Sequence, residues 1–288
     1  MDAHKQHPPA KRSTHSGEQS RLWFAITFLA RAVRVIPRSF VRFVRARYPT
    51  VFRGVVSRMP GPVRRRLVAF DPTELLVPIE ALQERFTQAL ARVREIRADA
   101  EFGDYVEFGV SVGTSISCMD AALKAAGVTD VRIFGFDSFE GMPPSAADED
   151  GGTWNPGDFV SSIGYTTANL QSKGVDLSRV RLIKGWFIDT ATPSTARGHS
   201  LTKCSVVMID CDIASATSVA LEFIAPLVLD SAVLFFDDWH SSGLAEKGLG
   251  ERMAYEAFLR VHSEFRSEPV DFAYNGNSEA FLLTRLEA

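Results

Sequence analysis

Short apolar runs alternate with stretches of helical periodicity along this chain after residue 77. Five runs rich in aliphatic and aromatic residues predict strands, at residues 105–108, 131–136, 180–183, 205–209 and 232–236. Helices are predicted where apolar residues recur every three or four positions, at residues 77–97, 115–126, 166–173, 215–227 and 248–264. Because strands that alternate with helices pair in parallel, the pattern predicts an α/β sheet with helices on both faces.

Two more apolar runs follow the last predicted helix. They cover residues 270–273 and 280–284, and the polar residues Asn275, Gly276 and Asn277 separate them. Turn-forming residues between two short strands are typical of a hairpin. We therefore expect an antiparallel hairpin to close an otherwise parallel sheet of seven strands.

The first predicted strand runs into a glycine turn. Glu107 lies near the end of the strand, Gly109 and Gly113 follow it, and helical periodicity begins at about residue 114. A strand, a tight turn and a helix N-terminus together expose backbone N–H groups to a small ligand. The stretch lacks the complete glycine fingerprint of dinucleotide-binding proteins, so its meaning depends on the residues that follow.

Acidic residues lie at or just after the ends of four predicted strands. They are Glu107, Asp137, Asp210, Asp212, Asp237 and Asp238. The carboxyl ends of parallel strands meet at one edge of a sheet, so we expect these side chains to converge on one cleft. Carboxylates this close repel one another, and a divalent cation relieves the repulsion. Oxygen donors from Asp212, Asp237 and Asp238 suit Mg²⁺, although Asp212 and Asp238 are also placed to cap the helices that follow.

Two of these acids have more specific expected roles. Asp137, at the end of the second strand, is placed to accept hydrogen bonds from both hydroxyls of a ribose, so we expect a nucleoside ligand. Asp210 lies two residues before Asp212 and reaches the same cleft. It is the candidate base that removes the proton of a substrate hydroxyl acidified by the metal ion.

Residues 142–165 form a long polar segment after the second strand. The segment contains three prolines, an acidic cluster at residues 148–150, and the aromatic residues Trp154, Phe159 and Tyr165. Loops of this length inside an α/β domain are usually lids or binding loops. The three aromatic side chains either cover a substrate or only anchor the loop to the body of the protein.

Charge is distributed unevenly along the chain. Residues 1–66 contain 15 Lys or Arg and 2 Asp or Glu, although the whole chain has a formal net charge of -3. We expect a disordered polar tail at residues 1–20 and a basic amphipathic helical extension at residues 21–70. The predicted α/β domain then covers residues 71–288.

The basic extension has more than one interpretation. Residues 21–66 interleave arginine with aromatic and aliphatic residues, as do segments that bind an anionic membrane surface. The extension can equally pack on the body of the protein or on a partner subunit of a homo-oligomer. No nucleic-acid partner is expected, because the basic charge comes without a recognisable nucleic-acid-binding motif.

The cysteines and the apolar runs bear on the location of the protein. Cys118, Cys204 and Cys211 form no C-x-x-C pair, which favours a reducing compartment without a disulfide framework. No apolar run reaches the roughly 18 residues that a membrane span requires. We therefore expect a cytoplasmic protein, peripheral at the inner face of the membrane if the basic extension binds lipid.

Five motifs together resemble the macrocin O-methyltransferase (TylF/MycF-like) family. They are VEFGVSVGTS at residues 106–115, FDSFEGMP at 136–143, KGWFIDT at 184–190, IDCD at 209–212 and FDDW at 236–239. The resemblance covers about residues 76–283 and is specific in the combination and order of the motifs. Members of this family are class I S-adenosylmethionine-dependent enzymes that methylate sugar hydroxyls of natural products with Mg²⁺. The resemblance therefore implies a Rossmann-like class I methyltransferase sheet.

The resemblance also implies roles for individual residues. It places Glu107, Gly109, Gly113, Ser115, Asp137 and Ser138 at the S-adenosylmethionine site, with Gly185 and Trp186 near it. It implies Asp210 as general base and Asp212, Asp237 and Asp238 as Mg²⁺ ligands. The residues after Asp212 read Ile-Ala-Ser-Ala-Thr, where the family often has an aromatic residue. That departure affects the expected contacts with the substrate and not the carboxylates.

The sequence thus predicts a Mg²⁺-dependent O-methyltransferase that acts on a hydroxyl of a sugar, of a glycosylated natural product or of a glycolipid. Two alternatives come from other classes of protein. A nicotinamide-dependent oxidoreductase has a similar sheet, but the missing third glycine and the clustered acids argue against it. A non-catalytic membrane-surface protein that keeps the fold is the second alternative, and the intact acids argue against that.

Overall fold

The fold comes from a computed structural model that describes residues 77–96 and 101–286. The expected polar tail at residues 1–20 and the basic extension at residues 21–70 lie outside the described residues. The five motifs and all the candidate site residues lie within them.

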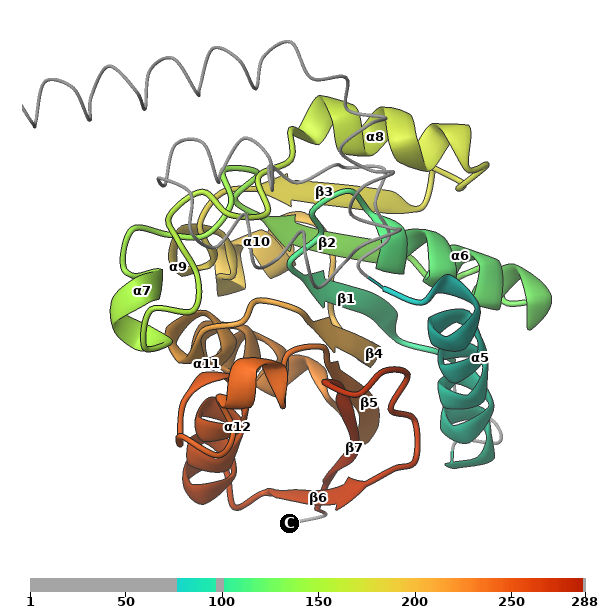
Figure 1. Cartoon of the computed structure of the whole chain (residues 1–288). Coiled ribbons are helices and arrows are strands. Elements are labelled where there is room, and N and C mark those ends of the chain that lie inside the picture. The colour runs from blue at the N-terminus through green and yellow to red at the C-terminus, as the bar shows by residue number, and fades with distance from the viewer. Residues whose placement is uncertain (1–76, 97–100, 287–288) are drawn as a thin grey trace, which may run out of the picture. The chain divides into compact units, whose positions relative to one another are not determined.

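A seven-stranded sheet forms the centre of the described domain (Figure 1). The strands are β1 (Asp104–Phe108), β2 (Ile133–Asp137), β3 (Val180–Lys184), β4 (Cys204–Ile209), β5 (Ser231–Phe236), β6 (Phe265–Pro269) and β7 (Glu279–Arg285). Their order across the sheet is β3-β2-β1-β4-β5-β7-β6. Strands β1 to β5 are parallel, and β7 runs antiparallel to β5 and β6. The predicted Rossmann-like α/β sheet with an antiparallel closing pair is confirmed.

Helices cover both faces of this sheet (Figure 1). They are α5 (Ile79–Ile96), α6 (Thr114–Ala125), α7 (Ala146–Glu149), α8 (Ile163–Ser172), α9 (Phe187–Thr190), α10 (Pro193–Gly198), α11 (Ala214–Ile224) and α12 (Gly250–Val261). Side chains alternate between the two faces of a strand. In β1, Tyr105 therefore packs in the apolar cluster of α5 and α6, whereas Val106 packs in that of α11 and α12. The order of the strands reverses between β1 and β4, so a crevice is expected at their carboxyl ends.

The edge of the sheet differs from the prediction. The strand predicted at residues 270–273 is wrong, because the edge strand is β6, formed by Phe265–Pro269. An edge strand packs on one side only, and β6 has mainly exposed or half-buried residues after Phe265, so no apolar run marks it. Val270 still donates a backbone hydrogen bond to Ala280 of β7 at 3.0 Å, but the chain then leaves the sheet, and Phe272 stacks on Phe235 of β5.

Short helices and helix ends also escaped prediction. The helix predicted at residues 248–264 runs too far, since α12 ends at Val261. Helices α7, α9 and α10 have four to six residues, too few for helical periodicity to be visible. A local signal did exist for α10, because Thr192 caps the helix and Pro193 occupies its first turn.

Candidate active site

The glycine turn after β1 is packed against the end of β4. Gly109 has a φ of +89°, and a Cβ there would lie 1.7 Å from the carbonyl oxygen of Asp210. Gly113 has a φ of +81°, and a Cβ there would lie 2.8 Å from Cδ2 of Leu170. Glycine alone combines this backbone conformation with so close an approach. The two glycines therefore shape the turn and bring it next to Asp210.

Asp137, the last residue of β2, holds that turn from the neighbouring strand. Its Oδ2 accepts hydrogen bonds from the backbone N–H groups of Val110 and Ser111, each at 2.8 Å. Its Oδ1 accepts one from the N–H of Phe139 at 2.6 Å. Each carboxylate oxygen has more than one acceptor site, so Asp137 keeps capacity for a ligand hydroxyl.

Glu107 lies beneath the turn and not on its open side. The side chain is fully buried, and its carboxyl group accepts hydrogen bonds from the hydroxyls of Tyr105 at 2.6 Å and Ser115 at 2.7 Å. Burial raises the pKa of Glu107 to about 8, against the opposing effect of those two hydrogen bonds. Glu107 therefore joins β1 to the first turn of α6.

Residues at the ends of β2 and β3 shape the next part of the wall. Ser138 Oγ donates a hydrogen bond to the carbonyl of Gly141 at 3.2 Å and accepts one from the N–H of Glu140 at 3.0 Å. Gly185 has a φ of +145°, and a Cβ there would lie 2.6 Å from Cγ2 of Thr190. The tight turn at Gly185 leads directly to Trp186.

A cavity of about 560 Å³ opens at the carboxyl ends of the strands. Nine of the candidate residues line it: Gly109, Ser115, Asp137, Ser138, Trp186, Asp210, Asp212, Asp237 and Asp238. Glu107, Gly113 and Gly185 are not part of the lining and act on the backbone behind it. The cavity thus connects the glycine turn with the aspartates that follow β4 and β5.

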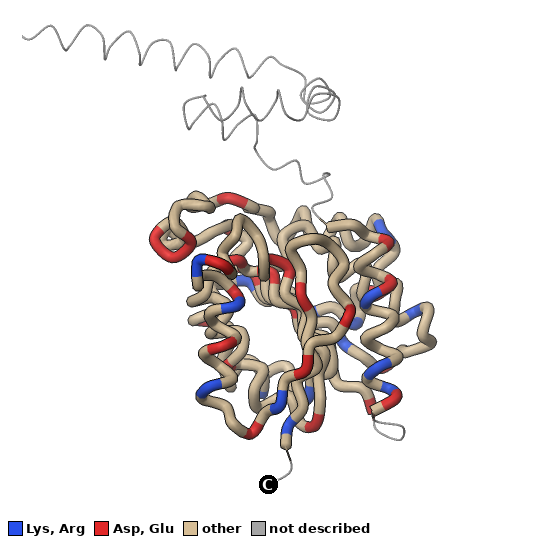
Figure 2. Tube along the Cα trace, turned by 60° about the horizontal axis from the view of Figure 1, so that its bottom comes forward, with Lys and Arg blue, Asp and Glu red and all other residues tan. Residues whose placement is uncertain are grey.

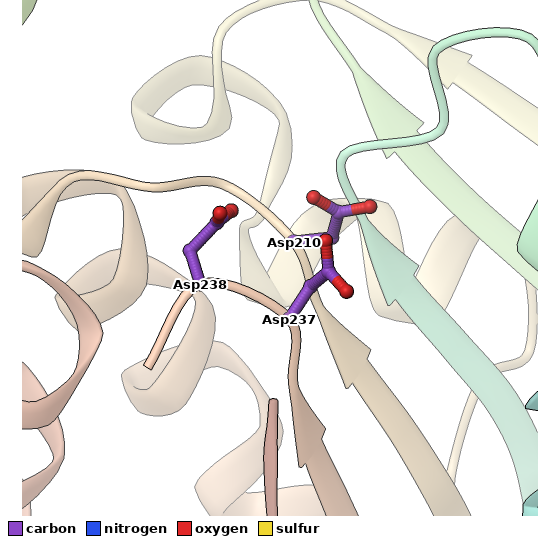
Figure 3. A group of neighbouring side chains, drawn as sticks. All are labelled: Asp210, Asp237 and Asp238. Atoms are coloured by element: carbon purple, nitrogen blue, oxygen red, sulfur yellow. The ribbon is translucent and has the colours of Figure 1, made fainter. Parts of the chain in front are cut away.

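Three aspartates meet at one end of this cavity. One carboxylate oxygen each from Asp210, Asp237 and Asp238 lies within 4.8 Å of the other two, a spacing at which all three can hold one metal ion (Figure 3). Burial and the neighbouring carboxylates raise the pKa of Asp210 well above its ordinary range. Burial and the charge of Asp237 raise the pKa of Asp238 to about 7.

Asp212 lies beside this group without belonging to the closest three. Its carboxyl group is hydrogen-bonded to that of Asp238, and burial together with the charge of Asp238 raises its pKa well above the ordinary range. Its φ is +62°, a left-handed conformation that is unfavourable for a residue with a Cβ. The structure therefore brings the four predicted aspartates together, and Asp210, not Asp212, forms the group of three with Asp237 and Asp238.

The C-terminal segment and α12 supply contacts that the sequence did not reveal. The Tyr274 hydroxyl donates a hydrogen bond to Oδ1 of Asp237, and Asn275 Nδ2 donates a second one to the same oxygen at 3.2 Å. Glu251 of α12 is 1% exposed and accepts hydrogen bonds from the backbone of the loops after β4 and β5. An acid in the first turn of a helix was visible for Glu251, but that signal is too common to indicate a site.

The composition of the lining fits a divalent cation. Among the described residues that line the cavity, none is Lys, Arg or His. The repulsion among the buried carboxylates is therefore not balanced by a basic side chain of the lining. Oxygen donors alone, spaced for one ion, are the ligands that Mg²⁺ and similar cations take.

Residues 141–159 cross one side of the cavity as a closed loop. Its base is held by two backbone hydrogen bonds, from Met142 N–H to Asp158 C=O at 2.9 Å and from Gly157 N–H to Met142 C=O at 2.8 Å. Trp154 and Phe159 meet edge to face at 5.1 Å between ring centroids, and both line the cavity. Tyr165 is 38% exposed and is not part of the lining.

A carboxylate joins this loop to the helix after β4. Glu149, in the acidic turn of α7, accepts hydrogen bonds from Ser215 N–H at 3.1 Å and from Ser215 Oγ at 2.9 Å. Helix α7 lies at the left edge of Figure 1, and its acidic positions are red in Figure 2. Ala146, the first residue of α7, forms a small apolar cluster with Met142 and Ile213. The loop is therefore docked against the segment that follows Asp212.

All three cysteines lie among the described residues. Cys118, Cys204 and Cys211 are buried, and none of these three described residues forms a disulfide. Of the helices in the described parts of the chain, none has the length and apolar character needed to cross a membrane.

Sequence comparisons relate this chain to O-methyltransferases. The sequence profile of the macrocin O-methyltransferase (TylF) family matches residues 65–252. A curated relative from Streptomyces olivaceus, 8-demethyl-8-(2,3-dimethoxy-alpha-L-rhamnosyl)-tetracenomycin-C 4'-O-methyltransferase, is 33% identical over 153 residues. That match covers 51% of this chain and 57% of the relative, so the chain spans little more than half the length of the protein it matches.

Solved structures share the fold at low sequence identity. The O-methyltransferase NovP superposes with a TM-score of 0.55 at 19% identity, covering 72% of this chain and 80% of NovP. The calicheamicin methyltransferase CalS11 superposes with a TM-score of 0.55 at 18% identity over 100% of both chains. These neighbours support the class I methyltransferase fold of the sheet.

Proposed function

The chain belongs to the macrocin O-methyltransferase family, and from this membership we propose that it transfers a methyl group from S-adenosylmethionine to a sugar hydroxyl of a glycosylated small molecule. The observation that carries the proposal is the cavity that joins the glycine turn after β1 to the aspartates after β4 and β5. A nucleoside-binding edge and a carboxylate cluster in one space suit a transfer between two bound molecules. This combination favours a methyltransferase over a nicotinamide-dependent oxidoreductase or a non-catalytic protein.

The cofactor half of the cavity is the part near β1, β2 and β3. When bound, S-adenosylmethionine supplies the methyl group that the acceptor oxygen receives. Asp137 and Ser138 accept hydrogen bonds from its ribose and adenine side, and Gly109, Ser115 and Trp186 form the wall around it. Glu107, Gly113 and Gly185 support that wall from behind, consistent with their positions outside the lining.

The acceptor half contains the proposed Mg²⁺ site. Asp212, Asp237 and Asp238 are the proposed ligands, and a bound Mg²⁺ lowers the pKa of a hydroxyl beside it. Asp210 accepts the proton of that hydroxyl, since it lines the same cavity as the proposed ligands. An alternative assignment makes Asp210 a metal ligand and Asp212 the base. The close spacing of Asp210 with Asp237 and Asp238 supports this alternative.

Substitution of Asp210 and of Asp212 distinguishes between these two assignments of the base. If Asp210 is the base, Asp210→Asn binds Mn²⁺ with nearly the affinity of the wild type but loses turnover. If Asp210 is a ligand, the same variant weakens Mn²⁺ binding and Asp212→Asn is the one that binds the ion normally. Calorimetric titration of both variants with Mn²⁺, followed by turnover at saturating Mg²⁺, distinguishes them.

The acceptor we propose is a neutral glycoside. The curated relative is named for methylation of a rhamnosyl group on tetracenomycin C. The described lining offers aromatic and aliphatic side chains such as Trp154, Phe159 and Ile188 and no basic side chain for a diphosphate. These features favour a sugar already attached to an apolar aglycone over a nucleoside diphosphate sugar.

A methyl-transfer assay tests the proposal on the full chain. The protein is incubated with S-adenosylmethionine, Mg²⁺ and p-nitrophenyl α-L-rhamnoside, and the product is analysed by mass spectrometry. We expect one added methyl group per sugar, loss of product in excess EDTA, and less or no product from dTDP-L-rhamnose. Failure to bind S-adenosylmethionine in a calorimetric titration would refute the methyltransferase proposal, whereas efficient methylation of dTDP-L-rhamnose would refute only the acceptor.

Two proposals concern the region before residue 77. Binding of an anionic membrane by residues 21–66 predicts salt-sensitive sedimentation of the full chain with anionic vesicles and its loss on deletion of residues 1–70. Equal sedimentation of the truncated chain would refute the anchor and with it a peripheral location at the inner face of the membrane. A homo-oligomer predicts a light-scattering mass that is a multiple of the 31.7 kDa chain.

A further inference from the structure

Glu251 is a buried acid to which the proposed reaction assigns no role. It lies in the first turn of α12 and is 1% exposed. Its Oε2 accepts a hydrogen bond from the backbone N–H of Asp238 at 3.1 Å, and its Oε1 accepts one from the N–H of Cys211 at 3.5 Å. A single carboxyl group therefore holds backbone atoms of two separate loops.

These two loops carry the acids of the site. Cys211 lies between Asp210 and Asp212 in the loop after β4, and Asp238 lies in the loop after β5. The left-handed conformation of Asp212 costs conformational energy and persists only if its surroundings hold it. The hydrogen bond that Glu251 accepts from Cys211, the residue before Asp212, is one such constraint. The hydrogen bond that Glu251 accepts from the N–H of Asp238 links the loop after β5 to the loop after β4.

We propose that Glu251 is a positioning residue, which spaces the carboxylates of the two loops to hold the divalent cation; this role rests on the cation site of the proposed function. Glu251 acts through the backbone of Cys211 and Asp238 and does not contact the acceptor. Groups that orient metal ligands in this way typically change metal affinity or activity by about 10- to 100-fold when they are replaced. A purely structural role for α12 would instead affect the whole protein.

Glu251→Gln is the variant that tests this role. The amide keeps the volume of the side chain and one acceptor oxygen, but its NH₂ group faces a backbone N–H with which it cannot pair. Glu256→Gln is the matched control, since Glu256 lies on the same helix and pairs with Arg252 on its exposed side. Each full-length variant is titrated calorimetrically with Mn²⁺ and, separately, with S-adenosylmethionine.

We expect Glu251→Gln to bind Mn²⁺ about tenfold more weakly or worse, with unchanged affinity for S-adenosylmethionine. Glu256→Gln behaves like the wild type in both titrations. In turnover, the Mg²⁺ concentration for half-maximal rate rises in Glu251→Gln, and the rate at saturating Mg²⁺ recovers most of the wild-type value. This split between cation affinity and maximal rate is not expected from a general loss of structure.

Each other outcome has a defined meaning. Equal Mn²⁺ affinity in Glu251→Gln and the wild type would overturn the positioning role and leave the proposed function intact. Parallel loss of Mn²⁺ and S-adenosylmethionine binding would overturn it in favour of a general structural role. A wild-type chain that binds no divalent cation would overturn the cation site and the role of Glu251 together. If Glu251→Gln does not fold, Glu251→Asp, which keeps the carboxyl group with a shorter reach, must show the same selective weakening.

Discussion

Replacement of Glu107 by glutamine changes how the stability of this protein depends on pH. Glu107 is fully buried beneath the glycine turn, where the hydroxyls of Tyr105 and Ser115 are its hydrogen-bond donors. Burial raises its pKa from 4.5 to about 8, so the folded protein holds this proton over a range in which the unfolded chain has released it. Glutamine fills the same volume and has no proton to release.

The sign and the size of the effect follow from that shift. Because the folded state binds the proton more tightly, Glu107 lowers the free energy of unfolding progressively as the pH rises from about 4.5 to about 8, and not further above that. A shift from 4.5 to about 8 corresponds to about 5 kcal/mol at most. The free energy of unfolding of Glu107→Gln, minus that of the wild type, should therefore grow by up to about 5 kcal/mol across this range.

Urea unfolding at a series of pH values measures this difference. Both proteins are unfolded without S-adenosylmethionine and in EDTA, so that no ligand shifts the other buried acids. The aspartates of the site titrate in both proteins, and their contribution cancels in the difference between them. Glu101→Gln, which replaces an exposed glutamate, reports the effect of removing any one carboxylate.

A difference that stays constant with pH, to within about 0.5 kcal/mol, would refute this reasoning. It would mean that Glu107 ionises in the folded protein at its ordinary pH despite its burial. A constant offset of about 1 kcal/mol on top of the pH-dependent part is expected, because the amide makes different hydrogen bonds from the carboxyl group.

Three further predictions concern the turn, the aspartates and the loop. Gly109→Ala should abolish S-adenosylmethionine binding, because the new Cβ would collide with the backbone carbonyl of Asp210. Gly174→Ala is the control and should bind normally, since Gly174 also has a positive φ, +73°, but has open space around the Cβ. Equal binding by both variants in calorimetry would contradict this. Tyr274→Phe removes a donor to Asp237 and should raise the Mg²⁺ concentration for half-maximal turnover, whereas Tyr255→Phe, which loses a bond to Ser267, should not. Glu149→Gln weakens the hydrogen bonds between the loop and Ser215 and should raise the KM for the acceptor several-fold without changing S-adenosylmethionine affinity. Asp148→Asn, at an exposed neighbouring position, is the control. Equal KM values in the two variants would exclude this role for Glu149.

Much of the site was predictable because it follows from local periodicity and sheet topology. Acids at the ends of parallel strands share one edge of the sheet, so the sequence alone assigned Asp210, Asp237 and Asp238 to that edge. The adjacency of β4 and β5 in the folded sheet then brings the three carboxylates within 4.8 Å of one another. The burial of Glu107 was also accessible in principle. Glu107 lies two residues after Tyr105 in β1, so both side chains point to the face of the sheet that α5 and α6 cover.

Other features depended on contacts between distant segments. Strand β6 has no apolar run, because it is an edge strand whose pairing with β7 supplies its order. Tyr274 and Glu251 reach the aspartates from segments whose own patterns indicate only an apolar stretch and a helix start.

The sequence by itself determined the class of fold, the family and the set of acids, whereas the tertiary structure decided which acids stand closest and what holds them. Periodicity and strand ends are local properties, and one chain segment is enough to specify them. Asp210, Asp237 and Asp238 come together where Asp212 has a left-handed backbone and where Glu251 accepts hydrogen bonds from two loops. Such contacts join residues far apart along the chain, so only the folded protein specifies them.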